Sequence, residues 1–242
     1  MSQTPVTEST LSPSGRFTQP GTATTTNHAP VQTLAALLQT LKVEALSSNR
    51  FRIGRVAFDR QQRTVQIPGR VKNRDLVIEY ALVTEQGKAY ESLLTTDASP
   101  IDIHLACLLL GAGQGSVGGA FRQAAPVPET NAVHIEVSWE TNSQPVHFAL
   151  SALVCLTASL PETATPTLGV EKWLYNGSGF DASGFAAQRE GSIISLIRDA
   201  AALVNNPAED RDNDAIHWPN AKLLPAEGWP VQVTLRFPSR RR

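Results

Sequence analysis

Short stretches of alternating apolar and polar residues between Arg50 and Thr96 constrain the fold more than any other feature of this chain. A period of two is typical of β-strands that bury one face. The pattern predicts four strands, at residues 50–58, 63–71, 76–83 and 90–96. Because close turns separate these stretches, we expect the strands to form an antiparallel meander.

A helix is expected directly after the fourth predicted strand. Ser99 is a favourable N-cap, and Pro100 suits the first helical position. Asp102 follows where the helix dipole favours a negative charge, and Gly111 is a typical residue at a helix end. The residues between these signals are apolar on most sides, so we expect a helix over residues 99–110 that is buried against the sheet.

The composition predicts a tail followed by one folded domain. Sixteen of the first thirty residues are Ser, Thr or Pro, and such a segment has too little apolar surface to offset its ordering entropy. Hydrophobic residues make up 41% of the whole chain, which is enough to build a core. We expect a disordered tail over residues 1–30 and a single α+β domain over residues 31–242. The expected fold class is antiparallel, β-rich sheets with one buried helix and few short helices.

Charge and cysteine content weaken several classes of function. The formal net charge of -1 gives no global field that would attract nucleic acid, so we expect no nucleic-acid partner. No stretch approaches the roughly 18 apolar residues of a membrane span. Cys107 and Cys155 are too few for an iron–sulfur cluster, which typically needs about four thiolates. Both lie in apolar runs, so we expect buried thiols, and a disulfide between them stays open.

The run from Gly113 to Gly118 matches the G-x-G-x-x-G pattern of dinucleotide-binding loops. Two features oppose that interpretation. Ser99 begins the preceding apolar run as a helix, so the glycines follow a helix instead of a strand. Pro126 comes too soon afterwards for a crossover helix that could bind a pyrophosphate. We therefore expect a loop here, with no bound cofactor.

Four titratable residues surround the junction between the fourth predicted strand and the helix. They are Glu91, Asp97, Asp102 and His104. A carboxylate near an imidazole can perform general acid–base catalysis, which makes Glu91, Asp97 and His104 the catalytic candidates. The alternative is structural: Asp97 lies in a turn, Asp102 complements the helix dipole, and His104 bonds to a backbone carbonyl.

Alternating aspartates near the C-terminus resemble the start of a calcium loop. They are Asp210, Asp212 and Asp214. The sixth position of an EF-hand loop needs glycine and the twelfth needs glutamate, but this chain has Ala215 and Ala221 there. An EF-hand is thus excluded. The three aspartates remain candidates for an irregular calcium site, and the alternative is a solvated acidic loop.

Three runs of sequence carry a family resemblance. They are KAYESLLTTDASPIDIHLACLLLGA (88–112), WLYNGSGF (173–180) and EGSIISLI (190–197). These runs resemble the YdjY-domain family of bacterial proteins, and the similarity extends over about residues 41–237. The resemblance implies an uncharacterised domain that is often found behind an export signal, and it brings no established activity. Some relatives are described in iron–sulfur terms, from which this chain departs because it lacks the cysteines.

Two hypotheses about function follow. The first is a non-catalytic extracytoplasmic binding or scaffolding domain with an unknown protein or small-molecule partner, because the chain has a neutral charge, a spacer-like tail and no catalytic motif. The alternative is a hydrolase-type enzyme that uses Glu91 and His104. The first residues lack the basic and apolar regions of a secretory signal. The expected location is periplasmic or extracellular if a signal was removed, and cytoplasmic otherwise.

Overall fold

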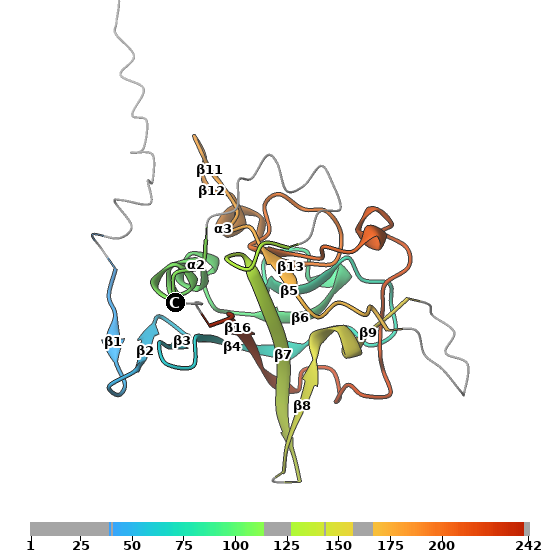
Figure 1. The fold of residues 1–242 in the computed structure, drawn as a ribbon. Coiled ribbons are helices and arrows are strands. Elements are labelled where there is room, and N and C mark those ends of the chain that lie inside the picture. The colour runs from blue at the N-terminus through green and yellow to red at the C-terminus, as the bar shows by residue number, and fades with distance from the viewer. Residues whose placement is uncertain (1–38, 40, 114–126, 143, 157–166, 240–242) are drawn as a thin grey trace, which may run out of the picture. The chain divides into compact units, whose positions relative to one another are not determined.

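The computed structural model describes residues 39, 41–113, 127–142, 144–156 and 167–239, and in it eight strands close into a barrel (Figure 1). Around the ring these strands follow the order β4 (Thr64–Val71), β16 (Pro230–Arg236), β7 (Ala132–Thr141), β10 (Trp173–Tyr175), β14 (Val204–Asn205), β13 (Ser192–Ser195), β5 (Tyr80–Thr84) and β6 (Ser92–Thr96). Pairing of β6 with β4 completes the ring. Four more strands extend the sheet: β1 (Glu44–Ala45), β2 (Arg50–Ile53) and β3 (Val56–Asp59) continue outward from β4, and β8 (Gln144–Ala149) pairs with β7.

The barrel contains both parallel and antiparallel neighbours. Strands β5 and β6 are parallel, as are β13 and β14. Adjacent parallel strands usually need a connection of a dozen or more residues. Here residues 85–91, which include the 3-10 helix η1 (Ala89–Glu91), are sufficient because each strand has only 5 residues. A seven-residue connection can span about 23 Å when it is extended.

The expected fold class, antiparallel sheets with one buried helix, is wrong. Alternation identified most of the strand positions, but a period of two is the same for either strand direction and says nothing of closure. The turn residues between β5 and β6 suggested a hairpin. Instead the chain returns through η1 and begins β6 in the same direction as β5, with Tyr80 paired to Ser92. Strand β6 can then pair with β4 and close the barrel.

The interior of the barrel is filled by strand side chains. Val233 pairs with Ile67 on one side and with Val137 on the other, so the three side chains share one face of the sheet. All three are fully buried. The neighbouring position on the other face, Gln232, is partly exposed. The row of Val233 therefore points into the barrel, and the row of Gln232 points outward.

Helix α2 (Pro100–Leu109) is buried over most of its length. Ile103, His104 and Cys107 are buried, whereas Leu109 is 45% exposed. The helix lies against β2, β3, β4 and α3 (Ala186–Glu190). The helix was expected to pack against antiparallel sheets, and that part of the fold class is wrong because the sheet beside it continues into a closed, mixed barrel.

The remaining elements are short. Two small sheets pair β11 (Phe180–Asp181) with β12 (Gly184–Phe185), and β9 (Val154–Cys155) with β15 (Trp218–Pro219). Two further 3-10 helices are η2 (Leu150–Leu153) and η3 (Glu209–Asp212). Both cysteines are buried free thiols, so no disulfide joins them. Residues 1–30 lie outside the described residues, and the expected disorder there stays a prediction.

Candidate functional site

The start of helix α2 is bound to α3. Ser99 is the N-cap residue, as predicted, but its hydroxyl makes no cap hydrogen bond. It donates instead to Gln188 Oε1 at 2.7 Å, and the same oxygen accepts the backbone N–H of Ile101 at 3.3 Å. Gln188 therefore supplies the acceptor that a serine N-cap normally provides. Asp102 is partly buried in the first turn, and burial raises its pKa.

His104 lies in the buried face of α2 and is 1% exposed. Its Nδ1 is 2.8 Å from the hydroxyl oxygen of Tyr175 on β10. Its Nε2 is buried and has no hydrogen-bond partner among the residues that the structure describes. Burial lowers the pKa of His104 to about 4, so the imidazole is neutral at neutral pH. The structural alternative for His104 expected a backbone carbonyl as its partner, and the structure has a tyrosine hydroxyl in that role.

Aromatic rings and a glycine enclose His104. The rings of Phe185 and Phe180 lie 5.0 and 6.5 Å from the imidazole, measured between centroids. Gly177 has a φ of +76°, and a Cβ there would lie 3.2 Å from His104 Cε1. A side chain at position 177 would thus be strained and crowded at once. His104 is thus packed against Phe185, Phe180 and Gly177 and has almost no contact with solvent.

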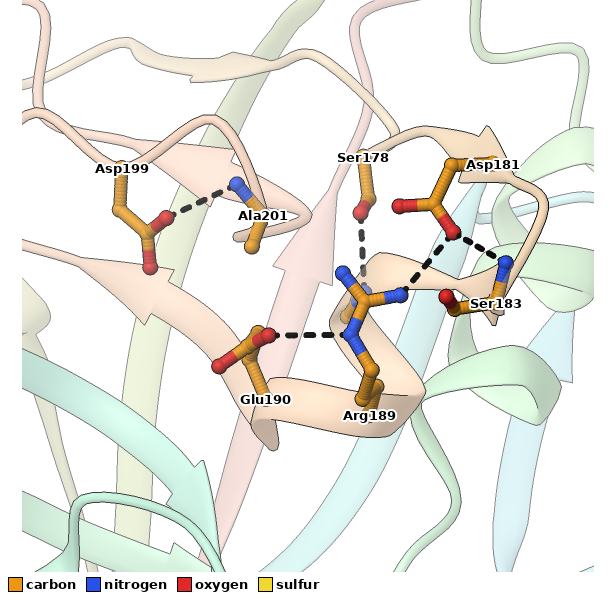
Figure 2. Close-up of polar contacts among 8 residues, drawn as sticks. Ser178, Asp181, Ser183, Arg189, Glu190, Asp199 and Ala201 are labelled. Atoms are coloured by element: carbon orange, nitrogen blue, oxygen red, sulfur yellow. Dashed lines mark hydrogen bonds and ion pairs between the residues drawn. The ribbon is translucent and has the colours of Figure 1, made fainter. Parts of the chain in front are cut away.

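Polar contacts hold the β11–β12 hairpin to α3 (Figure 2). Arg189 contacts Asp181 and Glu190, each at 3.1 Å. The hydroxyl of Ser178 accepts the backbone N–H of Ala187 at 3.0 Å. These groups already have partners within the hairpin and the helix, so we interpret them as structural.

Glu91 and Asp97 have surroundings different from those of His104. The backbone oxygen of Glu91 accepts the N–H of Glu79, and burial raises the pKa of Glu79, with the charge of Glu91 raising it further. Asp97 forms an exposed ion pair with Arg55 at 2.7 Å. Within the described part of the chain, no hydrogen bond or ion pair joins any two of the three catalytic candidates. The structure therefore does not bring them together as a catalytic group.

A lysine–tyrosine pair lies close to Glu91, and the sequence pattern did not indicate it. Lys88 Nζ donates to the hydroxyl of the buried Tyr80 at 2.5 Å and lies 4.7 Å from the centroid of that ring. Burial raises the pKa of Tyr80 well above its usual range, and the carboxylate of Asp199 raises it further. Tyr80 thus stays protonated at neutral pH and serves as the hydrogen-bond partner of Lys88, not as a base.

The three candidate calcium ligands have different surroundings. Asp210 Oδ2 lies 3.7 Å from Nε2 of the buried His217. Asp212 forms a bidentate ion pair with Arg198 through two contacts of 2.8 Å, and Asp214 is exposed. Across the residues that the structure describes, no group of three or more His, Cys, Asp or Glu side chains is placed to hold a metal ion. The geometry thus gives no support to a calcium site in this loop.

A surface groove of about 710 Å³ lies where β16 separates from the β7–β8 hairpin. It is lined by residues 138–140 of β7, by Pro145 and His147 of β8, and by residues 229–232 at the start of β16. Pairing between β16 and β7 ends at Gln232 and Ser138, after which each strand keeps only its other neighbour. The groove is thus the gap left by two strands that separate.

The floor of the groove carries a row of polar side chains. Gln232 pairs with Ser138, and Ser138 pairs with His147, so the three side chains share the outer face of the sheet. His147 Nδ1 lies 3.0 Å from Glu136 Oε1 in an exposed pair. Trp229 borders this row and is 41% exposed. Sequence reasoning missed this set because its members come from three separate stretches, and only strand pairing brings them together.

The run Gly113–Gly118 is described only at Gly113, whose N–H donates to Thr130. The rest of the motif lies outside the described residues, so the expectation of a loop without a nucleotide stays a prediction.

Comparison with known proteins identifies the family. In the described part of the chain, no helix is long and apolar enough to cross a membrane. No curated protein and no solved structure matches the chain. A family model described as the YdjY domain matches residues 56–236, which is most of the 242-residue chain. That range covers most of the barrel and all three of the runs that carried the resemblance. The chain therefore belongs to the YdjY-domain family.

Proposed function

We propose that this chain is a non-catalytic extracytoplasmic binding or scaffolding domain whose partner docks in the groove between β16 and the β7–β8 hairpin. The observation that carries the proposal is the exposed Trp229 beside the outer row of polar side chains. Binding sites typically combine apolar surface with a few polar groups that orient the ligand, and tryptophan is enriched among residues that dominate binding energy. The Ser/Thr/Pro-rich residues 1–30 support the extracytoplasmic part, since such segments often separate an anchor or signal from a domain.

The alternative, a hydrolase that uses Glu91 and His104, has less support. His104 is enclosed by aromatic rings and hydrogen-bonded to Tyr175. Glu91 lies beside Glu79 instead. A general base must reach the proton that it abstracts, either directly or through one water. The groove, by contrast, lies at the surface, so a partner can reach it without a change in the structure of the protein.

A fragment screen by NMR on the full chain tests this proposal. The indole N–H resonance of Trp229 can be assigned with Trp229→Phe, because the chain has only 4 tryptophans. We expect fragments that bind to shift the Trp229 resonance and to lose binding in Ser138→Arg, which fills the floor of the groove. Tyr90→Ala is the matched control, since it changes a side chain that is 72% exposed and lies outside the groove lining.

Fragments that bind equally well to wild type and Ser138→Arg, with no change at Trp229, would contradict the proposed site. A melting temperature of Ser138→Arg close to that of wild type shows that the variant is folded. Loss of binding in Tyr90→Ala as well would indicate a site other than the groove.

A further inference from the structure

We infer that the groove bordered by Trp229 takes an uncharged oligosaccharide. This inference rests on the proposed function and specifies its ligand. Five of the nine residues that line the groove are exposed, so it is a surface groove and not an enclosed pocket. A surface groove suits a segment of a chain-like ligand better than a small molecule that must be enveloped.

The charges of the groove favour an uncharged ligand. Among the nine described lining residues there is no lysine or arginine, and Glu140 is the one acidic side chain. Of two cations on the neighbouring strand β4 and just after it, Arg70 donates to the Gly228 carbonyl at 3.4 Å and Lys72 lies 3.5 Å from Glu227; neither lines the groove. An anionic ligand would meet Glu140 without a compensating cation. A polycation would find a single free carboxylate, because Glu136 is paired with His147.

The hydrogen-bonding groups of the groove match hydroxyls. Gln232, Ser138 and His147 lie on adjacent strands, which are about 4.8 Å apart, so they present donors and acceptors at regular spacing. A sugar hydroxyl both donates and accepts, and it can satisfy either kind of group. An apolar ligand would cover these side chains and leave them without hydrogen-bond partners, which is unfavourable.

The apolar surfaces of the groove are flat. Trp229 and Pro230 come from the start of β16, and Pro145 comes from β8. A pyranose ring offers a flat C–H face that can pack on an indole while its hydroxyls point to polar groups. The two prolines also disfavour an added peptide strand, because they lack the backbone N–H groups that a β-ladder would need.

Titration of the full chain with defined ligands tests the inference. The uncharged probes are hexasaccharides of β-1,4-linked glucose, β-1,4-linked N-acetylglucosamine and α-1,4-linked glucose, and the charged probes are polylysine and polyglutamate. We expect at least one hexasaccharide to shift the Trp229 indole resonance saturably. Isothermal titration calorimetry, which does not depend on the indole, should show that Trp229→Ala weakens that binding at least tenfold and that Tyr90→Ala changes it less than twofold.

The outcomes separate the ligand from the site. If polylysine or polyglutamate shifts Trp229 and no hexasaccharide does, the ligand class is wrong and the groove survives as a binding site. If no hexasaccharide binds but the fragments do, the saccharide inference fails alone. If neither fragments nor hexasaccharides affect Trp229, both the inference and the proposed function fail.

Discussion

The region around His104 and the groove beside Trp229 contain similar residue types in opposite physical states. Each has a histidine, aromatic rings and neighbouring polar groups. His104 is 1% exposed and hydrogen-bonded to Tyr175, and aromatic rings fill the space around it. His147 is exposed, paired with a carboxylate and adjacent to open space. A histidine among aromatic side chains is thus informative about function only after its exposure is known.

Burial explains the difference in chemistry between the two regions. Removing His104 from water disfavours its charged form and lowers its pKa to about 4. That histidine contributes packing and a hydrogen bond to Tyr175, so changes there should affect stability first. Groove side chains such as Trp229 pack less completely, so changes there should affect binding first. Three predictions test this distinction.

The largest expected effect is the loss of the aromatic ring next to His104. Tyr175→Ala removes a fully buried ring and the hydrogen bond to His104. We expect the free energy of unfolding to fall by about 3–5 kcal/mol, through lost transfer energy and a residual cavity. Urea denaturation measures it, with Tyr90→Ala as the exposed aromatic control. A loss below about 1 kcal/mol would mean that the His104 region is not a packed part of the core.

The second effect is a pH dependence of stability that comes from His104. The pKa of its imidazole is about 4 in the folded chain against an ordinary 6.5, so the unfolded chain binds more protons between these values. Stability should therefore fall as the pH drops from 6.5 towards 4. The total change from this residue is on the order of 3 kcal/mol.

Aspartate and glutamate carboxylates also titrate near this pH range. Comparing wild type with His104→Gln isolates the contribution of the imidazole, because the carboxylates are the same in both proteins. We expect the variant to lose stability less steeply than wild type between pH 6.5 and 4, whatever its stability at pH 7.5. Parallel slopes for the two proteins in urea denaturation would show that His104 is not a neutral, desolvated imidazole.

The smallest expected effect on stability is at the groove. Trp229→Ala removes a side chain that is 41% exposed, and we expect the free energy of unfolding to change by about 1 kcal/mol or less. The change should be well below that of Tyr175→Ala under the same conditions. A loss of several kcal/mol would mean that Trp229 serves mainly the core, and the comparison between the two regions would not hold.

Strand positions could be predicted from the sequence better than strand partners. The alternation between Arg50 and Thr96 places strands close to β4, β5 and β6. The single strand predicted over residues 50–58 is instead two strands, β2 and β3, which pair as a hairpin with Ile53 opposite Val56. The direction of β6 depends on how residues 85–91 return along the barrel, which a periodic pattern does not encode. The sequence also predicts a hairpin of residues 185–188 with 192–197 around Glu190 and Gly191. That prediction is wrong, since Ala186–Glu190 forms the helix α3 and Ser192 begins β13. Gly191 has a φ of +71° and ends that helix. Glycine is also favoured at positive φ in hairpin turns, so its presence does not distinguish the two structures.

Prediction of the candidate sites from the sequence had the same limit: local features could be predicted, and contacts between distant residues could not. The signals at Ser99 and Pro100 placed the start of α2 correctly, because the backbone preference of proline for the first helical turn is local. The contacts of His104 with Tyr175 and of Tyr80 with Lys88 depend on tertiary packing. The groove was harder still, since it forms where paired strands separate. Trp229 next to a proline at the start of a strand was its only sequence signal.

The most direct test of the central claim compares Trp229→Ala with His104→Gln in binding. The probes are the fragments and hexasaccharides that shift the wild-type spectrum, titrated at pH 7.5. Urea denaturation at the same pH first establishes that both variants are folded. We predict that Trp229→Ala raises the Kd at least tenfold and that His104→Gln changes it less than twofold. The reverse result, binding lost in folded His104→Gln and retained in Trp229→Ala, would contradict the account and place the functional site at the buried histidine.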